Sequence, residues 1–268
     1  MSQVSLLEKL IAISRRDILT AVRYRNGFLL GLIGTFAEMF TFFYLARAIG
    51  PAFRPEGVAF FPFLVVGIGF YSFLISGVQA FLSTVQEAQQ TGTIEVLLTT
   101  STPAPVLIFL SAFSAFAGKT AKLAFDLVVG LILFQVALPH PNFGATLAIF
   151  LLSLAVAIAM GVLAAAVQIA IQKGSAVIWL LSSVGFLTGT LFPVHILPIP
   201  LQWAAWLIPI THSLSGMRGA LLLGQSTSQL APEILWLGVA AFLLLPTSLF
   251  ILSWVLRRGR REGTLSFY

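Results

Sequence analysis

The chain has 268 residues, of which 58% are hydrophobic and only 9% are charged. Soluble domains carry roughly 25% charged residues, so this composition excludes an ordinary water-soluble protein and indicates an all-α integral membrane protein. The absence of cysteine excludes disulfides, thiolate metal sites and cysteine nucleophiles, and a net charge of +6 in a membrane protein describes loop placement rather than a nucleic-acid partner.

Residues 5–25 are predicted to form an amphipathic helix that lies in the headgroup layer. Its basic residues come after or among the apolar ones, which is not the order of a signal peptide. At 100° per residue, the apolar stripe consists of Leu7, Leu10, Ile11, Ile18, Ala21 and Val22. The charged residues Glu8, Lys9, Arg15, Arg16 and Arg23 fall roughly opposite. Such a face is attracted to anionic lipid; the alternative is a helix packed on another subunit.

Six apolar stretches follow, and each is a candidate transmembrane helix because about 20 apolar residues cross the hydrocarbon layer. They are residues 27–48, 58–83, 118–138, 143–171, 176–192 and 234–256. The third is expected to start earlier, because 104–117 is also apolar, and the fifth is short for a full crossing.

Residues 193–224 are apolar but rich in proline, with Pro193, Pro198, Pro200 and Pro209. A continuous helix would lose several backbone hydrogen bonds there. Broken backbone at membrane depth is tolerated only when it is buried in protein or lines a cavity. We therefore expect a re-entrant helical hairpin that dips into the membrane from one side, before the last span.

The basic residues predict the orientation. Twelve of the 15 Lys and Arg residues fall on one side of this six-span arrangement, and only Arg47, Arg54 and Arg218 fall on the other. The positive-inside rule then places both termini in the cytoplasm and the hairpin outside. We expect the membrane to be the plasma (bacterial inner) membrane. We expect one transmembrane domain over residues 1–268, ending in a cytoplasmic tail at 257–268.

The segment 86–103, between the second and third spans, is predicted to contain a short cytoplasmic helix. Thr93 is an N-cap candidate and Glu95 lies in the first turn, where its charge favours a helix start. Pro103 ends the segment, and Leu97 and Leu98 provide apolar anchors. The alternative is a loop that caps the base of the protein itself.

This segment resembles the coupling segment of type-2 ABC transporter permeases, the membrane subunits of ATP-binding-cassette exporters. The matching residues are Glu87, Gly92, Thr93, Glu95, Leu97, Leu98 and Pro103. A second stretch is similar to the family's signature before the last span: Gly189, Phe192, Pro193, Leu197, Pro198, Leu201 and residues 207–212. The resemblance covers nearly the whole chain, including the arginine-rich tail.

The resemblance implies a permease that works as a homodimer or close heterodimer, with each half docked on an ATPase subunit through the coupling helix. It implies an outward hairpin forming an external gate, with Phe192, Pro193, Pro198 and Pro209. The cargo would be amphipathic: a drug-like molecule, a lipid or a glycan-linked lipid. ATP and Mg would bind the partner, because Gly118-Lys119-Thr120 has Phe113 where a P-loop requires glycine. The chain itself is expected to be a transporter subunit and not an enzyme.

Polar residues within the spans leave alternatives open. Glu38 lies near the middle of the first span, where a carboxylate is costly to bury in hydrocarbon. It is either a residue of the transport pathway or dimer interface, or a structural contact between helices. Lys122 and Asp126 share a helix face as a structural pair. The alternative function is a proton-coupled secondary transporter that uses Glu38 and Asp126. Gln79, Gln135 and Gln168 either join helices or line a polar path.

His195 and His212 would suit an intramembrane enzyme, which is a further alternative. Two histidines without a third ligand do not make a metal site, and no carboxylate orients His212 toward Ser213 or Ser215. We therefore expect no catalytic residue and no metal site. Instead, we expect each histidine to lie at the membrane interface with its ring N–H hydrogen-bonded.

Overall fold

The computed structural model describes residues 25–91, 106, 123–125, 127–130, 132, 136, 138, 141–171 and 183–262. Every regular element in these ranges is a helix. The elements are α2 (Arg25–Ile49), η1 (Pro55–Gly57), α3 (Phe60–Gln90), α6 (Phe143–Ile171), η2 (Val194–Ile196), α8 (Ile199–Leu207), α9 (Pro209–Leu221) and α10 (Ala231–Glu262). The interfacial helix predicted at 5–25 lies outside the described residues, except for Arg25, which begins α2.

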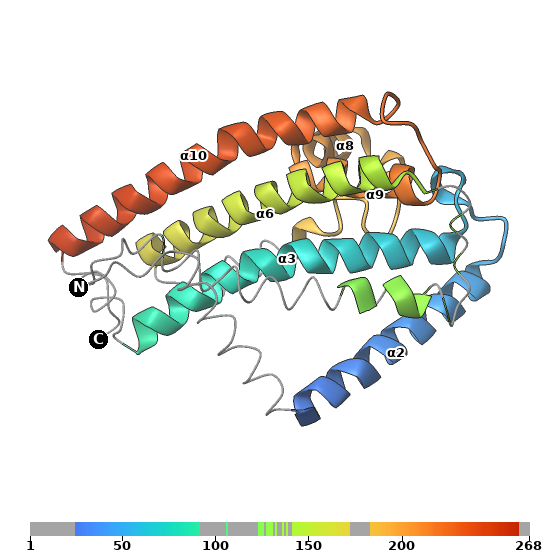
Figure 1. The fold of residues 1–268 in the computed structure, drawn as a ribbon, viewed down its shortest axis with the longest axis horizontal. Helices are drawn as coiled ribbons and strands as arrows, with labels where there is room; N and C mark the ends of the chain where they lie inside the picture. Colours follow the sequence, from blue (N-terminus) through green and yellow to red (C-terminus); the bar gives the residue numbers. More distant parts are fainter. Residues whose placement is uncertain are drawn as a thin grey trace.

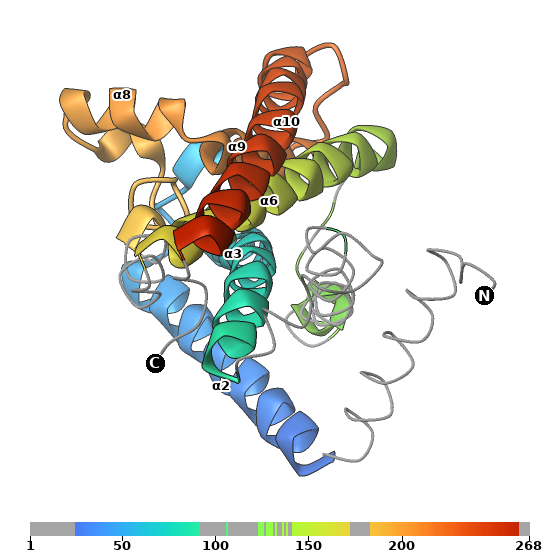
Figure 2. The same cartoon turned by 90° about the vertical axis from the view of Figure 1, so that its left-hand side faces the viewer.

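Helices α3, α6 and α10 form a bundle in which α6 lies between the other two (Figures 1 and 2). All three run in the same direction, so Gln90, Ile171 and Glu262 lie at one end of the bundle (Figure 1). We call this the distal end. The starts of the three helices lie at the other end, together with η2, α8 and α9, and we call it the hairpin end. Because the helices are parallel, the chain between α3 and α6 connects opposite ends, and so does the chain between α6 and the hairpin.

Four of the six predicted spans agree with helices of the structure. The stretch 143–171 has the same bounds as α6, while 27–48, 58–83 and 234–256 correspond to α2, α3 and α10. The predicted fifth span, 176–192, does not agree: residues 185–192 form turns and bends, and Gly189 has φ +79°, which a helix does not allow. Among the described residues, three helices are long and apolar enough to cross a membrane: Phe60–Gln90, Phe143–Ile171 and Ala231–Gly259. The full set of six crossings stays a prediction.

Local sequence sets where the long helices begin and how α10 tolerates a proline. The Asn142 side chain caps α6 by accepting a hydrogen bond from the Ala145 N–H at 3.1 Å. Pro246 lies inside α10, where it removes a backbone donor. The hydroxyls of Thr247 and Ser248 donate to the carbonyls of Leu243 and Leu245, at 2.6 and 2.9 Å. Such side-chain bonds help to satisfy backbone groups near a proline in an apolar helix.

The core has two main parts along the bundle. Near the hairpin end, α9 packs between α3, α6 and α10, through residues such as Phe70, Ile149, Leu214 and Leu237. Near the distal end, α3, α6 and α10 pack directly. The residues of that cluster include Phe81, Val85, Val162, Ala165, Ile169, Leu252, Val255 and Leu256. Gly161 allows the close approach, because a Cβ there would lie 2.6 Å from the Phe81 ring.

Large apolar side chains also cover the outside of the bundle. Exposed examples are Leu30 and Ile33 on α2, Leu147 and Leu151 on α6, and Leu235, Phe242 and Phe250 on α10. Water would make such a surface unstable, whereas hydrocarbon matches it. The chain is therefore an integral membrane protein.

Candidate functional site

The candidate site is the broken helical segment 183–230, which packs against α3 at the hairpin end. The prolines occupy the positions where each short helix begins: Pro193 precedes η2, Pro198 precedes α8, and Pro209 is the first residue of α9. Proline lacks an N–H and has a fixed φ, so it suits a helix start and prevents a continuous helix. The predicted interruption of this region is confirmed.

Side chains close the turns between these short helices. The Gln202 amide donates to the carbonyls of His195 and Leu197, at 3.1 and 2.7 Å. The Thr211 hydroxyl donates to the Ala205 carbonyl at 2.6 Å, which joins α9 to α8 across the turn. The hairpin is therefore held together by polar side chains that satisfy its own backbone.

Arg218 in α9 connects the hairpin to α3. Its side chain is only 2% exposed. Nη1 donates to the Gly189 carbonyl at 2.8 Å, Nη2 to the Thr190 carbonyl at 3.0 Å, and Nε and Nη2 to the Phe63 carbonyl at 3.3 and 3.2 Å. The guanidinium carbon also lies 3.4 Å from the centroid of the Phe63 ring. A buried charge is stable only when it is well satisfied, and here three carbonyls and an aromatic face satisfy it.

The local backbone is shaped to receive this guanidinium. Gly189 has φ +79°, a conformation that side chains other than glycine rarely adopt, and its carbonyl is one of the acceptors. On α3, a Cβ at Gly67 would meet the guanidinium and would lie 2.8 Å from the Thr190 carbonyl. Two glycines, far apart in the sequence, thus make room for one arginine.

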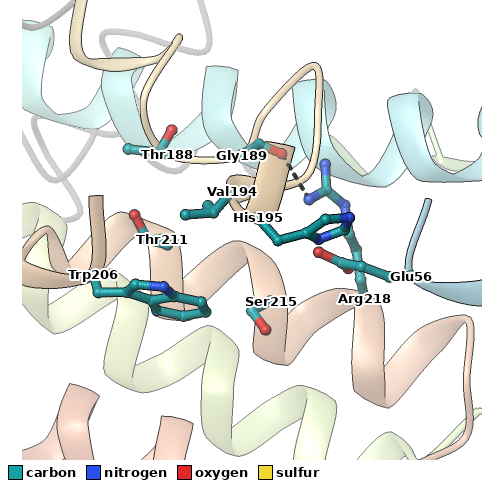
Figure 3. Close-up of a pocket in the computed structure, with 9 residues that line it drawn as sticks. All are labelled: Glu56, Thr188, Gly189, Val194, His195, Trp206, Thr211, Ser215 and Arg218. Atoms are coloured by element: carbon teal, nitrogen blue, oxygen red, sulfur yellow. Dashed lines mark hydrogen bonds between the residues drawn. The ribbon is translucent and has the colours of Figure 1, made fainter. Parts of the chain in front are cut away.

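A small cavity of about 60 Å³ lies beside Arg218 (Figure 3). It is lined by Glu56, Thr188, Gly189, Val194, His195, Trp206, Thr211, Ser215 and Arg218. Burial lowers the pKa of Arg218 to about 10, and the negative charge of Glu56 opposes this shift. The arginine therefore stays protonated at neutral pH. The cavity has room for a few water molecules rather than for an amphipathic molecule.

The histidines and serines near the hairpin have structural contacts. The His212 ring lies between Trp206 and Trp236, with centroids 5.2 and 5.4 Å apart, and its Nε2 is 2.9 Å from the Trp206 carbonyl oxygen. This confirms the expectation of a satisfied histidine. Ser213 accepts a hydrogen bond from Ser153 at 2.8 Å. Within the described ranges, no group of three or more His, Asp or Glu side chains is arranged to hold a metal.

The predicted gate residues lie at the hairpin, in different environments. Phe192 is half exposed, and its ring stacks on Phe60 at the start of α3, with centroids 6.4 Å apart. Pro193 is buried, Pro198 is exposed and Pro209 is half buried. The structure therefore brings Phe192 against α3.

Of the predicted coupling residues, the structure places only Glu87. It is exposed on the last turn of α3, at the distal end, where its carbonyl accepts bonds from the Thr91 N–H and hydroxyl at 2.9 and 2.8 Å. The other six lie outside the described residues: Gly92, Thr93, Glu95, Leu97, Leu98 and Pro103.

Two further sequence predictions concern polar residues within the helices. Glu38 is half buried in α2, next to Met39, which packs against α3. Gln168 on α6 donates to Gln89 Oε1 on α3 at 3.1 Å, so it joins two helices. Lys122, Asp126 and Gln135 lie outside the described residues.

Sequence reasoning missed the role of Arg218, which it counted as a charge on an outward loop. Its position inside an apolar stretch, between Gly216 and Gly219, was the available signal, because an isolated arginine in such a stretch needs buried partners. The partners themselves are 28, 29 and 155 residues away in the sequence, so spacing does not reveal them.

The fold and the site define a helical integral membrane protein with a broken helical segment at one end. The sequence matches the family model described as ABC-2 type transporter over residues 8–222. The chain therefore belongs to the ABC-2 type transporter family, whose members are permease subunits. A comparison with curated protein sequences gives no significant match.

Proposed function

We propose that this chain is the membrane-spanning subunit of an ATP-driven exporter for an amphipathic substrate. The proposal depends on one observation. In this member of the ABC-2 type transporter family, the hairpin lies at one end of the bundle, and the end of α3 that precedes the coupling segment lies at the other (Figure 1). In such a protein, the hairpin can act at one face of the membrane and the coupling segment at the other. It would act with a second permease copy and with ATPase subunits in separate chains.

Helix α3 provides a direct mechanical connection between the two ends. Its 31 residues span about 46 Å at 1.5 Å per residue. Glu87 lies on its last turn, and the Phe63 carbonyl near its start accepts the hydrogen bonds of Arg218. A displacement of the coupling segment by the ATPase would therefore move α3 and, through Arg218, the hairpin. In this proposal the hairpin is the external gate, and Arg218 is a positioning residue of that gate.

An apolar cavity supports an amphipathic substrate. It has a volume of about 470 Å³ and lies among α3, α6, α9 and the residues Leu123, Ala124 and Leu127. Its lining is apolar except for Thr146, whose hydroxyl donates to the Asn142 carbonyl at 2.8 Å. Phe143 and Leu147 border it and are exposed on the outside of the bundle. An alkyl or aromatic portion of a substrate fits such a lining, because no polar group there needs a partner.

The charge distribution supports the orientation of the proposal. Arg257, Arg258 and Arg261 lie on α10 at the distal end, whereas Arg47 and Arg54 lie near the hairpin end. With the positive-inside rule, the distal end faces the cytoplasm and the hairpin faces outward.

The coupling segment provides the decisive experiment. Affinity-tagged protein, extracted from its native membrane, is expected to retain a partner that contains a P-loop, and this complex to hydrolyse ATP. Glu95→Arg reverses a charge at the proposed contact and Gly92→Pro stiffens the segment, so each should reduce partner recovery or hydrolysis at least tenfold. Arg54→Glu, an equally large charge change at the hairpin end, is the matched control. Full docking and hydrolysis in both coupling variants would contradict the proposal.

A further inference from the structure

The distal end of α10 carries a basic cleft that the gate and the coupling segment do not use. The cleft has a volume of about 500 Å³ and is lined by Trp254, Arg257, Arg258 and Arg261. These positions are spaced three, four and seven residues apart, so they share one face of the helix. The neighbouring residues Val255 and Leu256 are buried in the cluster that α10 shares with α6 and α3. Packing therefore turns the arginine face outward.

Contacts within the helix hold the arginine side chains close to the cleft. The guanidinium carbon of Arg258 lies 5.7 Å from the centroid of the Trp254 ring. The Nε of Arg257 donates to the Ser253 carbonyl at 3.1 Å, which takes one of its five N–H donors. Within the described part of the chain, no carboxylate lines the cleft. The site is therefore strongly positive and rich in donors.

The length of α10 places this cleft at headgroup depth. Glu233 lies in the first turn of α10, and the 21 residues from there to Trp254 span about 32 Å, close to the ~30 Å of the hydrocarbon layer. Arg257 and Arg258 then lie about 5–6 Å further along the helix, within the ~5–7 Å of one headgroup layer, and Arg261 lies about 10 Å further, at its outer edge. Tryptophan is typical of the boundary between hydrocarbon and headgroups.

We propose that Trp254, Arg257, Arg258 and Arg261 form a binding site for the phosphate headgroup of an anionic phospholipid. The planar guanidinium matches a phosphate in geometry and charge, and each exposed phosphate oxygen accepts several N–H donors. Trp254 contacts the glycerol and upper acyl region of the same lipid. The lipid anchors the end of α10 at the same end of the bundle as the end of α3 that leads into the coupling segment (Figure 1).

The test compares lipid retention by the full-length protein in nanodiscs of equal phosphatidylglycerol and phosphatidylcholine. After extraction in mild detergent, native mass spectrometry counts the lipids that stay bound. The wild type is expected to retain phosphatidylglycerol preferentially. Arg261→Gln should reduce this preference about fivefold and the triple variant R257Q/R258Q/R261Q more strongly, since each arginine near a lipid surface favours an anionic lipid by about that factor. R47Q/R54Q, at the opposite end of the bundle, is the matched control.

Other occupants of the cleft give different results. If millimolar inorganic phosphate displaces phosphatidylglycerol, the site recognises a soluble anion and the lipid proposal is wrong. If the triple variant keeps its lipid preference but loses the co-purified ATPase, the arginine face is a protein-docking surface, which also overturns the proposal. An equal loss of preference in R47Q/R54Q would show only a general charge effect and would overturn it as well. The unfolding temperature of Arg261→Gln in phosphatidylcholine nanodiscs serves as a folding control. If it equals that of the wild type, the loss of preference for phosphatidylglycerol does not result from misfolding.

Discussion

At the scale of single residues, Arg218 is the strongest constraint on the hairpin. It fixes the turn at Gly189 and Thr190 and the start of α3 with one side chain. Lysine has the same charge, but an ammonium group cannot reproduce the planar fork that reaches three carbonyls. The residue type is therefore set by geometry as well as by charge.

Arg218→Met is expected to destabilise the protein by about 3 kcal/mol, because three buried carbonyls lose a donor at about 1 kcal/mol each. This corresponds to a fall in the unfolding temperature of roughly 6–12 °C, measured by fluorescence in detergent. Arg218→Lys should lie between the wild type and Arg218→Met. The exposed control Arg54→Met should change stability by no more than about 0.5 kcal/mol. An unchanged unfolding temperature for Arg218→Met would show that these hydrogen bonds do not hold the hairpin.

Gly67→Ala should reproduce part of this defect without changing any charge. The added methyl group would meet the guanidinium of Arg218 and the Thr190 carbonyl, so the arginine must shift. We expect a loss of about 1–3 kcal/mol in the same unfolding assay. Gly238→Ala in α10 is the control, because nothing lies within 4 Å of its Cβ, and it should stabilise the helix by about 0.5–1 kcal/mol. Equal behaviour of the two variants would contradict the close approach at Gly67.

His212 predicts a pH dependence of stability. Burial between the tryptophans lowers its pKa below the usual 6.5, and a bond to the Trp206 carbonyl and the charge of Glu233 oppose this less strongly. The unfolded chain therefore binds the proton first, so stability is complete above pH 6.5 and falls as the pH drops below that value. Unfolding temperatures between pH 7.5 and 5.0 should show this loss. His212→Gln should reduce it.

At the scale of elements, polar residues join helices that otherwise meet through small and apolar side chains. Gln168 and Gln89 connect α6 to α3 at a distance of 3.1 Å, close to the distal cluster. The Oε1 atom of Gln168 is buried without a partner among the described residues. The sequence left open whether Gln168 lined a path or joined helices, because a single sequence does not show which face of α6 meets α3.

The two glutamines are expected to differ in how much stability is lost when each is replaced by leucine. Gln89→Leu should cost about 1–2 kcal/mol, because it leaves the buried Gln168 amide without its acceptor. Gln168→Leu should cost less, because it also removes the unpaired oxygen, and the double variant should resemble Gln168→Leu alone. Unfolding of the four proteins gives the coupling energy. Simple additivity of the two single changes would contradict the interhelical contact.

At the scale of the whole molecule, α3 connects the hairpin to the distal end. If the hairpin is a gate, fixing it to α3 should stop transport. The sequence has no cysteine, so Phe60→Cys and Phe192→Cys introduce one unique pair where the two rings now stack. A cleavable bifunctional thiol reagent should block the transport of whichever substrate the wild-type complex moves in proteoliposomes, and reduction should restore it.

The controls separate gating from damage. Phe60→Cys alone, treated with the same reagent, should keep transport, and the linked protein should keep its ATPase partner. Undiminished transport by the linked protein would show that the hairpin and the start of α3 do not separate during the cycle.

The sequence by itself determined the class of protein, the bounds of α6 and the interruption of the hairpin. These features depend on composition, on the length of apolar runs and on the fixed φ of proline, all of which are local. Only the tertiary structure decided the role of Arg218, the need for Gly67 and Gly161 to be small, and the outward direction of the arginine face of α10. Each of these depends on which distant segments pack together, as in the bond that joins Arg218 to Phe63 across 155 residues.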